Sequence, residues 1–360
     1  MRPTSATVRL DAIVDNYRLA VQLAPASKSI AVIKANAYGH GLLKVAQALE
    51  PEVPAFAVAF IDEAVQLRDA GIRKPILVLQ GATRATDITD AAANHFWLLL
   101  HQQRQVEWVL SSKSTAPVKV WLKVDTGMHR LGLAPEVLDQ ICGDLASSPN
   151  VQKGVVLCTH LACADDMTNP MTSQQVSSIQ AVSTKHKLAM SIANSAGILC
   201  WPESHAEWNR PGYMLYGNSP MVPSGGDSFG LKPAMTMNSE IIAIRDVKPG
   251  EGVGYGSGWV AEKYSKIGTI AIGYGDGYPR HAPNGTPVLV NGQRVPLAGR
   301  VSMDAISVDL TDLEKVNVGD PVELWGQGLS VNEVALAAGT IGYELLAGLT
   351  GRAPLIYHCN

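Results

Sequence analysis

Short apolar runs alternate with longer amphipathic stretches over roughly the first 220 residues, and this alternation constrains the fold more than any other feature. The runs cover residues 30–33, 55–59, 76–79, 96–100, 119–124, 155–159 and 189–193, with a weaker one at 207–210. Amphipathic segments such as 62–70 and 135–145 lie between them and predict helices. Strands separated by helices pair in parallel. Eight such units predict an α/β fold with an N-terminal (β/α)8 barrel of the TIM type.

The pattern changes near residue 220, where Pro220 and the run 223–227 predict a turn-rich linker. Strands then follow one another with few helices between them, at 241–244, 267–272, 288–290, 301–308 and 322–325. Asn291-Gly292 predicts a hairpin turn and 331–338 a late helix. We therefore expect a barrel over 11–225 and a mostly-β domain over 226–360, which the strand within residues 1–10 is expected to join.

Charge and composition exclude several classes of protein. A net charge of −3, without a run of Lys or Arg, predicts no binding to nucleic acid or anionic membranes. The longest apolar runs, such as 96–100, are far shorter than a membrane span, and the N-terminus lacks the apolar core of a signal peptide. Five cysteines without a Cys-x-x-Cys pair support neither a disulfide framework nor a zinc ribbon. We expect reduced thiols and a cytoplasmic protein.

Lys34 ends the first apolar run and precedes a Tyr-Gly-His-Gly turn and a helix over residues 42–49. The carboxyl end of a barrel strand is where active sites lie. An amine that emerges from an apolar strand is partly desolvated, which lowers its pKa and suits a Schiff-base nucleophile. The alternative is a solvated lysine at the end of a strand.

Arg130 follows the strand 119–124 in a glycine-punctuated loop, so it is expected at the same mouth of the barrel as Lys34. Its planar guanidinium suits a carboxylate ligand, and a surface ion pair with Asp125 is the alternative. Strand alternation places Lys123 on the same face as Asp125. An inward Lys123 is a buried amine, which is costly unless it is modified or paired.

Cys158, His160, Cys163 and Asp165 are potential metal ligands, but their spacing matches no zinc pattern, and we predict no metal site. A core histidine held by hydrogen bonds is the simpler interpretation of His160. The loops after the seventh and eighth strands of such barrels form a phosphate site. This place is occupied by Asn194, Ser195, Gly212 and Tyr213, which could otherwise be ordinary caps and turns.

Five segments together resemble the alanine racemase family of fold-type III pyridoxal-phosphate enzymes. They are AVIKANAYGHG, KVDTGMHRLG, GVGYG, IAIGYGDGYPR and GRVSMDA. The resemblance implies that Lys34 carries pyridoxal 5'-phosphate, that Tyr38 joins the phosphate ligands and that Arg210 faces the pyridine nitrogen. Gly351 stands where some members carry a phosphate-binding tyrosine, and Tyr357 lies nearby as the candidate replacement.

The resemblance also implies roles around the substrate. Arg130 would orient the alanine carboxylate and Lys123, carbamylated in many members, would hold Arg130. His160 would tune the catalytic tyrosine, with Asp165 in a supporting place. That tyrosine is Tyr255, which is expected to come from the partner subunit of a homodimer. The partner would also supply Met303 and Asp304 to the substrate pocket, and Tyr274 would narrow the entrance.

The expected activity is interconversion of L-alanine and D-alanine by two bases, Lys34 for D-alanine and Tyr255 for L-alanine. It would supply D-alanine for peptidoglycan or serve alanine catabolism. A broader amino-acid racemase or a basic-amino-acid decarboxylase would keep the cofactor residues and change the pocket. A non-catalytic carrier of the cofactor would need only one barrel, and the last 130-odd residues argue against it. A barrel with a purely structural β domain is the remaining alternative.

Overall fold

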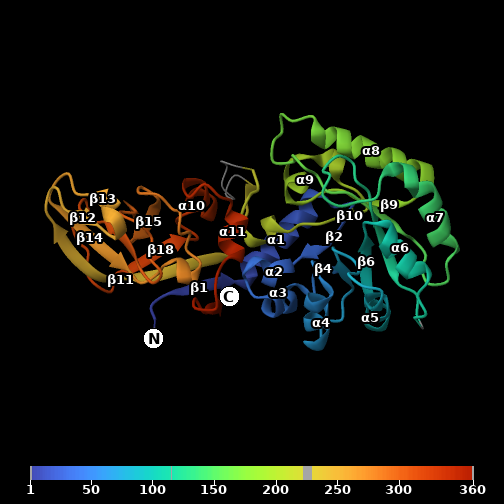
Figure 1. Cartoon of the computed structure of the whole chain (residues 1–360), viewed down its shortest axis with the longest axis horizontal. Coiled ribbons are helices and arrows are strands. Elements are labelled where there is room, and N and C mark those ends of the chain that lie inside the picture. Colours follow the sequence, from blue (N-terminus) through green and yellow to red (C-terminus); the bar gives the residue numbers. More distant parts are fainter. Residues whose placement is uncertain (1, 115, 222–228, 359–360) are drawn as a thin grey trace.

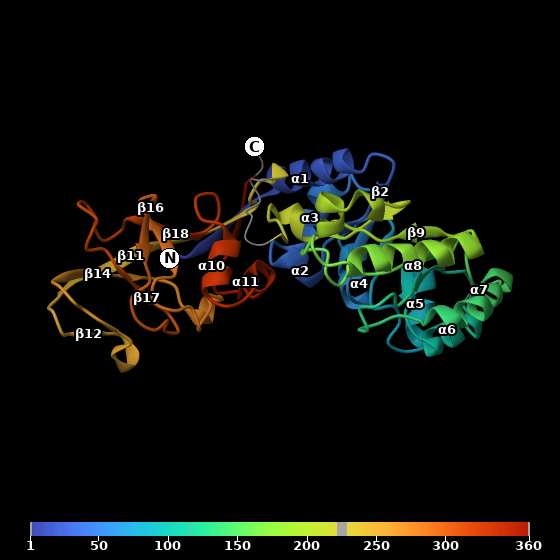
Figure 2. The same ribbon diagram turned by 90° about the horizontal axis from the view of Figure 1, so that it is seen from above.

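The computed structural model describes residues 2–114, 116–221 and 229–358. The chain forms two bodies side by side along its long axis, a barrel with surrounding helices and a mostly-β domain (Figures 1 and 2). The run 223–227 of the predicted linker lies outside the described residues, as does Cys359. No helix in the described part of the chain is both long and apolar enough to cross a membrane.

The first body is built on a parallel sheet that closes on itself. Its order is β2-β10-β9-β8-β7-β6-β5-β4-β3, in which β2 and β3 are two halves of one strand interrupted at Ile30. The Ile30 N–H donates to Asn209 O (2.8 Å) and the Ala31 N–H to Ala55 O (3.2 Å), so this strand joins the last strand to the second. Eight strands thus form the barrel, and the predicted (β/α)8 architecture is confirmed. The strands are β2 Lys28–Ser29, β3 Ala31–Val32, β4 Phe56–Val58, β5 Ile76–Val78, β6 Phe96–Leu100, β7 Lys119–Lys123, β8 Val156–Cys158, β9 Ala189–Ser191 and β10 Trp208–Asn209.

Helices surround this sheet and turn their apolar faces toward it. In α3, Leu42, Val45, Ala46 and Leu49 recur at helical spacing and are all buried. The apolar side chains of these helices join those on the outer face of the strands in one large core cluster, and inward-facing strand residues such as Leu77 and Trp121 form a separate cluster inside the barrel. The helices are α1 Leu10–Leu23, α3 Leu42–Leu49, α4 Ile61–Asp69, α5 Thr86–Asn94, α6 Gln103–Leu110, α7 Leu138–Ser147, α8 Met171–His186 and α9 Ser195–Cys200. The short segment α2, Lys34–Tyr38, has a left-handed backbone at residues 35–38.

The second body is a mostly antiparallel sheet of order β16-β15-β18-β11-β1-β19, extended by β14 and β17 beside the long strand β11. The N-terminal strand β1 (Ser5–Arg9) pairs antiparallel with β11 and parallel with β19. Helices α10 (Val331–Ala337) and α11 (Gly342–Ala347) lie between this sheet and the barrel (Figure 1). The strands are β11 Met235–Val247, β12 Gly252–Val253, β13 Trp259–Val260, β14 Ser265–Ile270, β15 Pro287–Val290, β16 Gln293–Pro296, β17 Ile306–Asp309, β18 Pro321–Trp325 and β19 Leu355–His358.

Two local predictions in this domain have different outcomes. Asn291 and Gly292 both have positive φ and link β15 to β16, so the predicted hairpin turn is confirmed. The strand predicted over 301–308 is wrong in its first half, because β17 begins only at Ile306. The Ser302 hydroxyl accepts from the Ala305 N–H (3.2 Å) and donates to Ala305 O (2.6 Å), which turns the chain before the strand.

Candidate active site

A cavity of about 780 Å³ opens at the carboxyl ends of the barrel strands. Lys34 follows β3, Lys123 ends β7, His160 follows β8 and Arg210 follows β10, and all four line it. Of the described residues around this cavity, Asp165 alone is acidic. The cavity therefore favours anionic ligands. Seven further residues named from the sequence also line it: Tyr38, Arg130, Asp165, Asn194, Ser195, Gly212 and Tyr213.

The backbone after Lys34 adopts a left-handed turn that the sequence did not predict. Residues 35–38 all have φ between 51° and 54°, although none is glycine. Each such residue costs roughly 1–2 kcal/mol, so the surrounding contacts must hold this turn in place. Gly39 and Gly41 complete it, and a Cβ on Gly39 would lie 2.0 Å from Leu346 O in α11.

Glu63, in the first turn of α4, anchors this turn from outside the cavity. Its Oε1 accepts from the Ala35 N–H (2.7 Å), and its Oε2 accepts from the N–H groups of Ala59 (2.7 Å) and Phe60 (3.3 Å). Burial and the positive charge of Arg130 lower the pKa of Lys34, and Glu63 partly opposes them. An amine of lowered pKa is more often neutral, as a nucleophile or base must be.

Arg130 does not form the ion pair with Asp125 that the sequence left open as an alternative. The Asp125 carboxylate instead accepts from the N–H groups of Gly127 and His129 (3.1 Å each) and contacts His129 Nδ1 (3.1 Å). Arg130 is exposed toward the cavity. Lys123 is only 6% exposed, and burial lowers the pKa of its amine. Among the described residues its amine has no hydrogen-bond partner.

Arg210 is a buried cation fixed by residues at the carboxyl ends of β8 and β9. Its Nη1 donates to Ser191 Oγ (2.6 Å) and its Nη2 to Thr159 O (2.6 Å) and Ile192 O (3.3 Å). Within the described chain its Nε has no acceptor, which leaves this donor for a ligand. Burial and the charge of Arg210 lower the pKa of His160 well below its usual value, so this imidazole is neutral near pH 7.

Ser195, Gly212 and Tyr38 form a small polar cradle at the end of the barrel. Ser195 Oγ accepts from the N–H groups of Gly212 (3.1 Å) and Met214 (3.2 Å), so its own proton is free to be donated. A Cβ on Gly212 would lie 2.8 Å from the Tyr38 hydroxyl, and glycine keeps this space open. The side chain of Asn194 instead caps α9, where its Oδ1 accepts from the Gly197 N–H (2.9 Å).

Two tyrosines differ in their position relative to the cavity. Tyr357 lies in β19 beside β1, behind the Lys34 turn. Its hydroxyl packs against Gly41, so closely that a Cβ on Gly41 would lie 1.9 Å from it. It does not line the cavity, and Gly351 is exposed. Tyr343 at the start of α11 does line it, stacked on Tyr213 with ring centroids 3.7 Å apart. An isolated tyrosine in a short late helix gave no periodic signal, so the sequence reasoning missed it.

Four other residues named from the sequence do not line the cavity of their own chain: Tyr255, Tyr274, Met303 and Asp304. Tyr255 is 71% exposed in the loop between β12 and β13, at the end of the β domain far from the barrel (Figures 1 and 2). Tyr274 and Met303 are 40% and 50% exposed, and Asp304 is also exposed. The chain therefore does not bring Tyr255 to Lys34 by itself. No three His, Cys, Asp or Glu side chains of the described residues are grouped to hold a metal ion.

Comparison with known proteins gives one consistent family. The profile for the N-terminal domain of alanine racemase matches residues 8–220, and that for its C-terminal domain matches residues 234–357. The biosynthetic alanine racemase of Pseudomonas aeruginosa is 48% identical over 357 residues, which are 99% of each chain. The alanine racemase of Chromohalobacter salexigens is 46% identical and covers 99% of this chain and 98% of its own.

Solved structures agree with the sequence comparison. The crystal structure of biosynthetic alanine racemase from Pseudomonas aeruginosa superposes with a TM-score of 0.97 at 47% identity, covering 99% of this chain and 100% of that one. Alanine racemase from Bartonella henselae, solved with covalently bound pyridoxal phosphate, gives a TM-score of 0.90 at 32% identity with the same coverage. The chain belongs to the alanine racemase family of pyridoxal-phosphate-dependent isomerases, and the family predicted from its motifs is confirmed.

Proposed function

We propose that this chain interconverts L-alanine and D-alanine, with pyridoxal phosphate held in the barrel cavity. The observation that carries the proposal is the convergence of Lys34, Lys123, Arg130 and Arg210 on a cavity whose described lining has one acidic residue. A phosphorylated cofactor and a carboxylate substrate offset these positive charges. The name of the Pseudomonas aeruginosa relative supports a biosynthetic role, the supply of D-alanine.

The described residues fit the cofactor by their chemistry. Lys34 offers an amine of lowered pKa for covalent attachment. Ser195, Tyr38 and the backbone around Gly212 offer donors for the phosphate, and Tyr343 takes the role first given to Tyr357. Arg210 has its Nε left to face the ring nitrogen. A guanidinium keeps its own protons, so that nitrogen would remain unprotonated.

Racemisation requires removal of a proton from one face of the α-carbon and delivery of a proton to the other. Pyridoxal phosphate, when bound, delocalises the negative charge left on that carbon. Lys34 exchanges the proton on the D-alanine face and Tyr255 on the L-alanine face. Arg130 grips the substrate carboxylate, since it is exposed toward the cavity and has no ion pair among the described residues.

Lys123 supports a further assignment, as a carbamate that holds Arg130. A buried ammonium without a partner among the described residues is costly. After the ammonium loses a proton, the neutral amine would form an N–C bond to carbon dioxide and release a second proton to solvent, which leaves a carbamate anion in place of the cation. The resulting charge has the opposite sign to that of Arg130. An inactive Lys123→Ala variant that regains activity with added acetate would support this role.

The active site is shared between two subunits of a homodimer. Tyr255 is exposed at the far end of the β domain, so only another copy can bring it near Lys34. Met303, Asp304 and Tyr274 are exposed in the same domain and would enter the partner's site with it. The described cysteines are all free, which is consistent with the cytoplasmic location we expect for the enzyme.

Mixing two inactive variants tests the shared site. Lys34→Ala lacks the cofactor amine, and Tyr255→Phe lacks the second base. Random reassociation gives half mixed dimers, each with one intact site and one doubly defective site, so about a quarter of wild-type activity should return. Wild type should also exchange the α-proton of both enantiomers in heavy water. Full retention of that proton by wild type with bound cofactor would refute racemisation, and failure of complementation would refute site sharing.

A further inference from the structure

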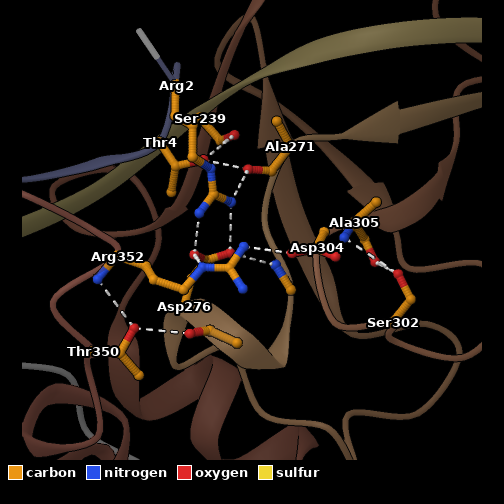
Figure 3. Close-up of polar contacts among 12 residues, drawn as sticks. Arg2, Thr4, Ser239, Ala271, Asp276, Ser302, Asp304, Ala305, Thr350 and Arg352 are labelled. Carbon is orange, nitrogen blue, oxygen red and sulfur yellow. Dashed lines mark hydrogen bonds and ion pairs between the residues drawn. The ribbon is translucent and has the colours of Figure 1, made fainter.

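A second cluster of charged side chains surrounds Asp276 in the β domain (Figure 3). The Asp276 side chain is fully buried, with 0% exposure. Arg2 binds it in two-point fashion, with Nη1 to Oδ1 at 2.6 Å and Nη2 to Oδ2 at 2.9 Å. Arg352 Nε approaches Oδ1 at 3.2 Å, and the Gly273 N–H donates to Oδ2 (3.0 Å). A buried carboxylate is costly unless it is paired, and this one has two guanidinium partners.

Arg352 connects this buried carboxylate to an exposed one. Its Nη2 donates to Asp304, whose side chain is 66% exposed, while its Nε faces Asp276. The bridge thus runs from the core of the β domain to its surface. Two guanidinium groups and two carboxylates balance in charge across the cluster. Because one end of Arg352 is held at Asp276, the other end fixes where the Asp304 carboxylate lies.

The backbone of two loops closes over the same cluster. The Tyr274 N–H donates to Ser302 O and the Gly275 N–H to Met303 O, both at 3.0 Å. A Cβ on Gly275 would lie 2.5 Å from Arg352 Nη1, so glycine lets this guanidinium pass beneath the loop. Thr350 ties in the chain next to Arg352, since its hydroxyl donates to Gly275 O (2.8 Å).

We propose that Arg352, anchored on Asp276, is a positioning residue for the alanine pocket of the partner subunit. It acts through Asp304 and the adjoining loops of Met303 and Tyr274, and it touches no substrate itself. The inference rests on the proposed function, in which these loops complete the partner's active site. Because Arg352 fixes the Asp304 carboxylate and neutralises its charge, Asp304 keeps the pocket small. It also does not compete with the substrate carboxylate for Arg130. Loss of the bridge would release Asp304 and loosen the pocket.

The test compares steady-state kinetics of Arg352→Ala with wild type in both directions. We expect KM for each enantiomer to rise about tenfold and kcat to stay within about twofold, because substrate placement changes and the two bases do not. Cofactor absorbance and the dimer mass should be unchanged. Arg294→Ala is the matched control, since it removes a guanidinium from the exposed pair with Glu333 in the same domain. Its KM should equal that of wild type.

Two more variants separate positioning from general stabilisation. Arg352→Lys keeps one ionic contact but cannot bridge two carboxylates, so its KM should lie between those of wild type and Arg352→Ala. In an Asp304→Ala background, Arg352→Ala should raise KM by less than half of the factor by which it raises KM in the wild-type background.

Equal KM in Arg352→Ala and the Arg294→Ala control, or full additivity of the effects of Arg352→Ala and Asp304→Ala on KM, would overturn the inference. If Arg352→Ala does not fold, the KM of Arg352→Lys decides, and a wild-type value refutes it. Wild type without racemase activity would refute the proposed function instead.

Discussion

The contacts of Glu63 predict a measurable dependence of Lys34 on a residue outside the cavity. Glu63 accepts from the Ala35 N–H through one oxygen and from the N–H groups at the start of α4 through the other. Glu63→Gln keeps the size of the side chain but offers only one acceptor atom. Either Ala35 or Ala59 would then face an amide NH2, and its N–H would lose its partner.

Loss of this acceptor should lower both the stability of the chain and its turnover. A hydrogen bond to a charged group contributes about 1.5–3 kcal/mol, and Glu63 is half-buried, so we expect a loss of about 2 kcal/mol in the free energy of unfolding. The left-handed run 35–38 costs on the order of 4 kcal/mol or more, so a weakened anchor favours its relaxation. Lys34 would shift with it, and kcat should fall about a hundredfold, as expected for a displacement near 1 Å.

The assay combines urea unfolding with kcat and with the visible absorbance of the bound cofactor. Asp62→Asn is the matched control, because Asp62 lies in the same first turn of α4, is exposed and makes no hydrogen bond to a described side chain. It removes the same charge from the helix N-terminus without touching the turn. If the free energies of unfolding of Glu63→Gln and Asp62→Asn differ by less than about 0.5 kcal/mol and the two variants have equal kcat, Glu63 does not anchor the turn.

Substitutions at the cavity residues Tyr343 and Lys34, and at His40, which is buried next to the Lys34 turn, have further expected outcomes. Tyr343→Phe should weaken the affinity for pyridoxal phosphate about tenfold in an absorbance titration, and Tyr357→Phe should leave it unchanged; the reverse order would restore the original assignment. Lys34→Ala should abolish both racemisation and the visible band of the bound cofactor, and an unaltered spectrum would remove this amine from the mechanism. Burial lowers the pKa of His40 to about 4 from 6.5, so the unfolded chain binds the extra proton between these values and stability falls as pH drops through them, by up to about 3 kcal/mol. His40→Gln should flatten this dependence in urea unfolding at pH 7 and pH 4.5, and an unchanged slope would exclude His40 as its source.

The parts of the structure that follow from the sequence are those with a repeated signal. Eight apolar runs at the spacing of βα units were sufficient to predict the barrel. In a barrel of parallel strands, the carboxyl ends of all strands lie at the same mouth. Lys34, Lys123, His160 and Arg210 could therefore be expected in one cavity from their places at strand ends alone. Their roles needed the resemblance, since position does not distinguish a ligand from a cap. Asn194 illustrates this, because its side chain caps α9.

The features that escaped prediction depend on contacts distant in sequence. The left-handed turn after Lys34 is held by Glu63, by α11 and by the glycines at 39 and 41, and its own residues give no warning of it. Tyr343 reaches the cavity only because α11 packs between the two domains. The first half of the run 301–308 reads as a strand by its composition, but a local serine turn prevails there.

The position of β1 has a consequence for how the chain is made. Its partners β11 and β19 are synthesised late, so β1 has no partner strand while the barrel residues that follow it are synthesised. The β domain can complete its sheet only when both chain ends are present, which is a pairing of very high sequence separation and hence slow to form. A nascent or truncated chain that lacks β19 would expose one edge of β1, and such unpaired edges invite aggregation.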